Sequence, residues 1–114
     1  MSWAQVVRMA RAFPEVEPGT AYGTPALRVR KRFMLRLRED QKSLAVRCGF
    51  DERDFRLRAD PRTFYVTDHY RGYPAVLVRL DRVSPRVMRE VLEQAWRVNA
   101  PKTLVRGWDE TARL

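Results

Sequence analysis

Between residues 26 and 48, apolar side chains occur at every second position, and this alternation is the strongest constraint on the fold. Leu27 and Val29 alternate with arginines in the first of three short segments. The second and third segments show the same alternation. Their apolar positions are Phe33, Leu35, Leu37, Leu44, Val46 and Cys48. A strand directs alternate side chains to opposite faces. We therefore expect a three-stranded antiparallel meander with one apolar and one basic face, Met34, Arg36 and Arg38 pointing outward.

Helices are predicted at both ends of the chain and once between the strands. Ser2 and Gln5 have the spacing of a capping box, so a helix should begin there and stop before Pro14. A short helix is expected over residues 51–60. Ser84 followed by Pro85 favours the start of a last helix, which should end before Pro101.

Two further strands complete the expected fold. They are predicted over residues 63–66 and 75–80, whereas the prolines and glycines of residues 14–25 favour a loop. The predicted order is α-β-β-β-α-β-β-α. Because the helices and strands are not regularly alternating, we expect an α+β two-layer sandwich, with helices packed on one face of a five-stranded antiparallel sheet. The length of 114 residues suits one domain over residues 1–114.

The chain offers few residues for catalysis or metal binding. One cysteine and one histidine, Cys48 and His69, leave too few ligands for a transition-metal site. No secretory leader or membrane span is expected, and a lone cysteine suits a reducing compartment, so a cytoplasmic location is predicted. We expect no cofactor, no metal, no catalytic residue and no membrane partner, and the protein is predicted not to be an enzyme.

Positive charge is concentrated in the predicted meander. The chain has a net charge of +9, from 23 basic and 14 acidic residues. The segment from Arg28 to Arg47 holds eight of the basic residues and only two acidic ones, which gives it a net charge of +6. Like charges side by side on a sheet repel one another. A genome rich in arginine codons explains why arginine exceeds lysine, but it does not explain this clustering.

Four segments of the chain resemble the MmcQ/YjbR family. They read FPEVEPGTAYGTPALRVRKRF, SLAVRC, TDHYRGYPAVLVRL and AWRVNAPKTL, and they extend from Phe13 to Leu104. The most specific pieces are YGTP at residues 22–25 and HYRGYP at residues 69–74. At the first hairpin turn the family often has Gly-Lys, whereas residues 30–32 of this chain read RKR.

The resemblance implies a small double-wing domain that binds DNA. Members of the family adopt a compact α+β fold likened to CyaY-like and secretion-chaperone-like proteins. Two hairpin wings flank a basic surface, for which the family is described as DNA-binding. The whole chain would then be one domain of this type.

We predict that the basic face binds DNA through phosphate groups, with little sequence preference. Strands about 4.8 Å apart bring side chains to separations comparable with those between phosphates. The predicted contacts are Arg28, Arg30, Lys31, Arg32, Arg36, Arg38, Lys42 and Arg47. Two other interpretations remain open. The face is merely solvated, or it binds an acidic protein partner, in which case the chain is an interaction module using this face or a groove between sheet and helices.

Other polar and aromatic residues have structural interpretations that we favour over functional ones. His69 is interpreted as a hydrogen-bonded turn residue, with catalysis as the alternative. Packing in turns is favoured over base stacking for Tyr22, Tyr65, Tyr70 and Tyr73. Cys48 alternates toward the core and is predicted to be buried and unreactive.

The last helix is predicted to be structural. Its acidic and basic residues are spaced for three i, i+4 pairs: Arg86–Glu90, Arg89–Glu93 and Glu93–Arg97.

Overall fold

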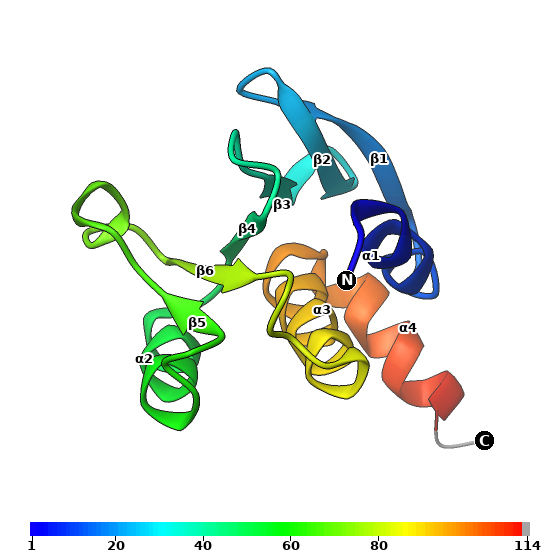
Figure 1. Cartoon of the computed structure of the whole chain (residues 1–114). Helices are drawn as coiled ribbons and strands as arrows, with labels where there is room; N and C mark the ends of the chain where they lie inside the picture. The colour runs from blue at the N-terminus through cyan, green and yellow to red at the C-terminus, as the bar shows by residue number, and fades with distance from the viewer. Residues whose placement is uncertain (113–114) are drawn as a thin grey trace.

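Within residues 1–112, which the computed structural model describes, four α-helices and a six-stranded antiparallel sheet form an α+β structure (Figure 1). The elements are α1 (Trp3–Ala10), β1 (Val16–Ala21), β2 (Thr24–Val29), β3 (Arg32–Leu37), β4 (Ser43–Arg47), α2 (Phe50–Ala59), β5 (Phe64–Tyr65), the 3₁₀ helix η1 (Asp68–Tyr70), β6 (Ala75–Arg79), α3 (Pro85–Asn99) and α4 (Lys102–Ala112). The strand order is β1-β2-β3-β4-β6-β5. None of the described helices is both long and apolar enough to cross a membrane.

The helix starts follow the predicted caps. Ser2 Oγ accepts a hydrogen bond from the Gln5 backbone N–H at 3.2 Å, and Gln5 Oε1 accepts one from the Ser2 N–H at 2.8 Å. At α3, Ser84 Oγ accepts from the Val87 N–H at 3.2 Å. These bonds satisfy backbone donors that have no partner inside the helix. The three predicted helices are therefore confirmed as α1, α2 and α3.

The prediction of five strands is wrong because residues 16–21 form a strand, not a loop. β1 pairs with β2 from Val16 opposite Val29 to Ala21 opposite Thr24. It is an edge strand, so it forms ladder bonds on one side only and tolerates Pro18, which has no N–H to donate. The predicted meander is confirmed as β2-β3-β4, with β1 added at its edge.

The predicted order also lacks α4, which follows Pro101. One face of this helix carries Leu104, Val105 and Trp108, which pack against the core. The Pro101 carbonyl accepts hydrogen bonds from the Leu104 and Val105 N–H groups at 3.0 and 3.1 Å. Arg97 on α3 pairs with Asp109 on α4 at 2.7 Å. Proline thus ends one helix and precedes the next, because its missing N–H is not needed in a first turn.

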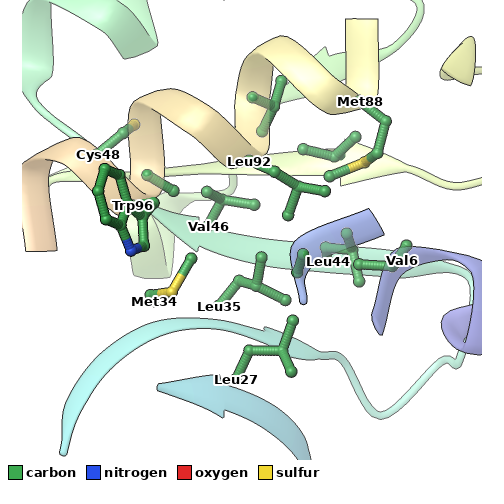
Figure 2. Close-up of a cluster of buried hydrophobic side chains, with 14 of the residues drawn as sticks. Val6, Leu27, Met34, Leu35, Leu44, Val46, Cys48, Met88, Leu92 and Trp96 are labelled. Carbon is green, nitrogen blue, oxygen red and sulfur yellow. The ribbon is translucent and has the colours of Figure 1, made fainter. Parts of the chain in front are cut away.

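The hydrophobic core lies between the helices and one face of the sheet (Figure 2). The strands contribute alternate residues that are at most 1% exposed: Leu27, Val29, Leu35, Leu44, Val46, Val76 and Val78. From the helices come Val6, Met88, Leu92, Ala95 and Trp96, each fully buried. The apolar face predicted from the alternation is therefore the face that the helices cover.

A β-bulge in β3 changes which of its side chains face the core. Leu27 pairs with Leu35 but Arg28 pairs with Phe33, so Met34 is the extra residue. Met34 is fully buried, whereas Phe33 is only partly buried and lies 5.9 Å from the Arg28 guanidinium on the other face. The expectation that Phe33 points inward and Met34 outward is wrong, because a bulge reverses the alternation of side chains.

The β2–β3 turn holds two non-glycine residues in a left-handed conformation. Arg30 and Lys31 have φ values of 46° and 70°, as in a two-residue type I′ turn that normally contains asparagine or glycine. We expect Lys31→Gly to raise the free energy of unfolding by about 0.5–1 kcal/mol, because glycine adopts this φ without a Cβ clash. Urea denaturation measures the change.

The matched control for this turn is Lys31→Gln, which removes the same charge and keeps the strained φ. Its stability should stay close to that of the unmodified protein. Equal stabilisation by both variants would show that charge repulsion, not backbone strain, is relieved.

Candidate functional site

The face of the sheet opposite the helices carries the other set of alternate residues, and we call it the open face. Residues directly opposite one another in the ladder share a face, which places Ala26, Arg36, Ala45, Leu77 and Tyr65 in one row across five strands. The neighbouring positions on this face are Arg28, Phe33, Arg38, Arg47, Ala75 and Arg79. This face therefore collects arginines around a floor of small and apolar residues.

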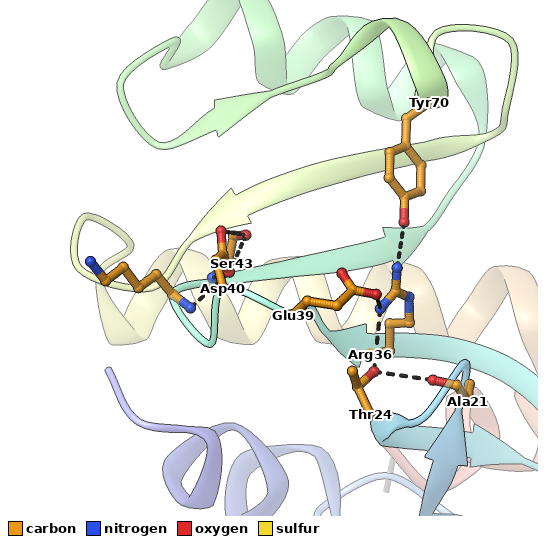
Figure 3. Close-up of polar contacts among 8 residues, drawn as sticks. Ala21, Thr24, Arg36, Glu39, Asp40, Ser43 and Tyr70 are labelled. Carbon is orange, nitrogen blue, oxygen red and sulfur yellow. Dashed lines mark hydrogen bonds and ion pairs between the residues drawn. The ribbon is translucent and has the colours of Figure 1, made fainter.

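Arg36 is the centre of a hydrogen-bond network on the open face (Figure 3). Its guanidinium donates to Tyr70 Oη at 2.9 Å, to Glu39 Oε1 at 3.0 Å and to Thr24 Oγ1 at 3.3 Å. Thr24 Oγ1 in turn donates to the Ala21 carbonyl at 3.1 Å. The network joins the β1–β2 turn, β3 and η1. It positions the two segments that flank the open face.

Both members of the Arg36–Glu39 pair are charged at neutral pH. Burial lowers the pKa of Arg36, but the hydrogen bonds and charge interactions with Tyr70 and Glu39 outweigh burial and raise it. The pKa of Glu39 is lowered by a hydrogen bond from its own backbone N–H and by Arg36. The pair has no net charge, so the free positive charge of the site comes from other residues.

Arginines lie against aromatic rings in four places on the open face. The guanidinium carbon lies 5.3 Å from the ring centroid in Arg36–Tyr22, 5.6 Å in Arg38–Tyr70, 4.1 Å in Arg79–Tyr65 and 5.9 Å in Arg28–Phe33. These distances lie within the range of cation–π attraction. Arg38 also donates to Tyr65 Oη at 3.0 Å. The aromatic rings thus help to fix the arginine side chains.

A cavity of about 660 Å³ opens on this face between the β1–β2 turn and residues 69–74. Its lining consists of Tyr22, Phe33, Arg36, Glu39, Ala45, Arg47, His69, Tyr70, Tyr73, Pro74 and Ala75. Two rings at its edge are unusually exposed, Tyr22 at 85% and Tyr73 at 57%. The cavity therefore combines aromatic walls with arginine donors.

His69 belongs to this cavity and is not the hydrogen-bonded residue that we expected. Its ring is exposed and lies edge-on to Tyr70, with centroids 5.1 Å apart. Within residues 1–112 its side chain forms no hydrogen bond, so that expectation is wrong. Arg53 on α2 holds the segment instead, because it donates to the carbonyls of Arg71 and Tyr73 at 2.9 and 3.1 Å.

The structure gathers four of the eight predicted contact residues on the open face: Arg28, Arg36, Arg38 and Arg47. Their surroundings differ. Arg36 points to the open face, as expected, but it is only 8% exposed because its guanidinium is held by Tyr70, Glu39 and Thr24. Arg47 is exposed at the end of β4.

The other four predicted residues lie in turns or at strand ends. Arg30 pairs with Glu15 at 2.8 Å, and this hydrogen bond lowers the pKa of Glu15. Lys31 and Arg32 are exposed beside it, but Arg32 pairs with Val29 and so begins β3 on the helix-covered side. Lys42 precedes β4, at the opposite end of that strand from Arg47.

Several residues of the site were missed by sequence reasoning. Phe33 was hidden by the bulge, which alternation alone does not reveal. Arg79 lies two residues after Leu77 in β6 and therefore shares its face, and that signal was present in the sequence. Tyr22 and Tyr73 lie in the YGTP and HYRGYP segments, where turn packing was the favoured interpretation, but their exposure shows that neither ring is buried in a turn.

Cys48 is 3% exposed, and burial raises the pKa of its thiol to about 12. We expect iodoacetamide at pH 8 to alkylate Cys48 only after unfolding, because the thiolate is the reactive form. Because the raised pKa favours the neutral thiol in the folded state, its contribution to the free energy of unfolding is complete below pH 9. This contribution is lost as the pH rises to about 12. Mass spectrometry with and without urea measures the labelling. Rapid labelling of the folded protein would contradict the assignment.

Comparison with known proteins identifies a family model and several relatives that match this chain. The YjbR family model matches residues 11–98, which include β1 through most of α3 and the whole lining of the cavity. Uncharacterized proteins from Mycobacterium tuberculosis and Mycobacterium bovis are 41% identical to it over 66 residues. That alignment covers 57% of this chain and 51% of each relative, so the chain spans about half the length of the curated relatives it matches. With the family model matching most of its length, the chain belongs to the MmcQ/YjbR family.

Proposed function

We propose that this protein binds DNA or another nucleic acid through the open face of its sheet, mainly by phosphate contacts and with little sequence preference. The observation that carries this proposal is the set of five arginines on one face, Arg28, Arg36, Arg38, Arg47 and Arg79. The acidic residues near them are Glu17 opposite Arg28, Glu39 beside Arg36, and Asp40, whose charge interacts with that of Arg38. Excess positive charge on one face attracts a phosphate backbone.

The cations best placed for phosphate contacts are those without an acidic partner. Among the described residues, no ion pair is formed by Arg28 and Arg47 on the open face, by Lys31 in the β2–β3 turn, or by Arg32, which begins β3 beside that turn on the helix-covered side. Within residues 1–112, Arg38 and Arg79 also form no ion pair, but they are held against Tyr70 and Tyr65. The first four lie close together because the β2–β3 turn and the end of β4 are at the same end of the sheet. We expect these four residues to contribute most of the electrostatic attraction.

Low sequence specificity follows from the shape of the site. Base-specific readout of a duplex normally uses a helix or ribbon that enters the major groove. The arginines here lie on a sheet face flanked by the β1–β2 hairpin and the β5–β6 connection (Figure 1). Contacts with the backbone position a nucleic acid without reading its sequence.

A salt titration of binding tests the proposal. Fluorescence anisotropy with labelled duplex DNA, single-stranded DNA and RNA should give micromolar dissociation constants at about 50 mM salt. The slope of log affinity against log salt should be near −4, because four or five neutralised phosphates each contribute about −0.9. Absence of binding to all three at low salt would contradict the proposal and favour an acidic protein partner.

A further inference from the structure

We propose that the cavity on the open face accepts one unstacked base, so that the protein prefers single-stranded nucleic acid to duplex. This inference rests on the proposed function and names the form of nucleic acid that the same site takes. The observation behind it is the pair of exposed tyrosines, Tyr22 and Tyr73, on opposite sides of a cavity with a small-residue floor.

The lining suits a flat aromatic ring. Ala45 and Ala75 leave room above the strands, while Phe33, Tyr70 and His69 provide further aromatic surface. Its volume of about 660 Å³ is within the usual range for small-molecule sites. Stacking of a base on an aromatic side chain contributes about 5- to 150-fold in affinity. Although Arg36 lies against one side of the Tyr22 ring, Tyr22 and Tyr73 are 85% and 57% exposed and keep surface for such stacking.

Charge selects against the other common ligand of an aromatic cavity, an organic cation. The Arg36 guanidinium already lies 5.3 Å from the Tyr22 ring centroid, and Arg47 also lines the cavity. Glu39 also lines the cavity and neutralises Arg36, so the remaining positive charge is that of Arg47, which disfavours a cationic ligand and favours a base that carries a phosphate. Arg47 is exposed and has no acidic partner among residues 1–112, so it can contact the phosphate.

The cavity should bind a single-stranded nucleic acid in preference to a duplex. The bases of a duplex are paired and stacked, so one of them must be extruded before it can enter such a pocket. In a single strand the bases separate easily, and their faces become accessible to aromatic side chains. A pocket lined by residues of two flanking turns thus favours a flexible single strand over a rigid duplex.

Abasic DNA separates base stacking from phosphate binding. We would measure anisotropy with oligothymidine of about 15 nucleotides, an abasic strand of equal length and a duplex. The protein should bind oligothymidine at least about 10-fold more tightly than the abasic strand and more tightly than the duplex. Tyr22→Ala combined with Tyr73→Ala should weaken oligothymidine binding at least about 10-fold and leave abasic binding and the salt slope unchanged.

Two control variants guard against nonspecific effects. Tyr22→Phe keeps the ring and should retain the affinity for oligothymidine. Phe55→Ala removes a ring on α2 that is 51% exposed and is not part of the cavity lining, and it should also leave oligothymidine binding unchanged. Circular dichroism and thermal melting confirm that each variant is folded.

The outcomes distinguish the two proposals. Equal affinity for oligothymidine and the abasic strand would overturn the base pocket while leaving phosphate binding intact, and tighter binding of duplex would do the same. No binding to any strand at low salt would overturn both proposals. If thymidine monophosphate competes at the same concentrations as the oligonucleotide, the occupant is a free nucleotide and the single-strand inference is wrong.

Discussion

Replacing Trp96 with alanine is expected to lower the free energy of unfolding by about 3–5 kcal/mol. Trp96 is fully buried, and its ring centroid lies 5.9 Å from that of Phe13 and 5.6 Å from that of Trp108. Its Nε1 donates to the Pro14 carbonyl at 2.9 Å. The substitution therefore leaves a cavity between α1, α3 and α4 and an acceptor without its donor. For a domain stabilised by about 5–15 kcal/mol, this loss is severe.

Urea denaturation followed by circular dichroism measures this effect. Trp96→Phe keeps an aromatic ring and loses only the indole hydrogen bond and some volume, so it should cost about 1–2 kcal/mol. A loss below about 1 kcal/mol for Trp96→Ala would contradict the packing described for this cluster.

The second large effect concerns the affinity for nucleic acid. Replacing Arg28, Lys31, Arg32 and Arg47 with glutamine should weaken binding at least about 10²-fold at 50 mM salt and flatten the salt slope by about three units. The fold should persist, because none of the four side chains belongs to the core. Anisotropy titrations at several salt concentrations give both numbers.

A matched set of substitutions removes the same charge from the helices. Arg8, Arg11, Arg58 and Arg106 are exposed on or beside α1, α2 and α4. Their replacement with glutamine should change the slope by less than about one unit. If the two sets behave alike, the net charge of the protein accounts for binding and the open face is not a site.

Most of the fold could be predicted because local rules and tertiary packing agree. The alternation in β2, β3 and β4 and the caps at Ser2 and Ser84 each follow from a few neighbouring residues. β1 was missed because an edge strand can contain Pro18 and Gly19, which resemble a loop in sequence. α4 was missed because its apolar stripe is short and follows a helix-ending proline.

The site was less predictable because it depends on contacts between distant segments. Clustering of charge in residues 28–47 pointed to the sheet face opposite the helices as the candidate site. It did not show that Arg36 is hydrogen-bonded to Glu39 and Tyr70, or that Arg30 forms an ion pair with Glu15. The aromatic cavity depends on the bulge at Met34 and on the approach of Tyr22 to residues 69–74. Neither is encoded in a short sequence pattern.

Chemical-shift mapping by NMR tests most directly whether the open face binds nucleic acid. On addition of oligothymidine, we predict that the largest backbone amide shifts occur at Tyr22, Phe33, Arg47 and Tyr73. The exposed helical residues Phe55 and Val98 should be unaffected. Shifts concentrated on α2, α3 or α4, with the open face unchanged, would contradict the account.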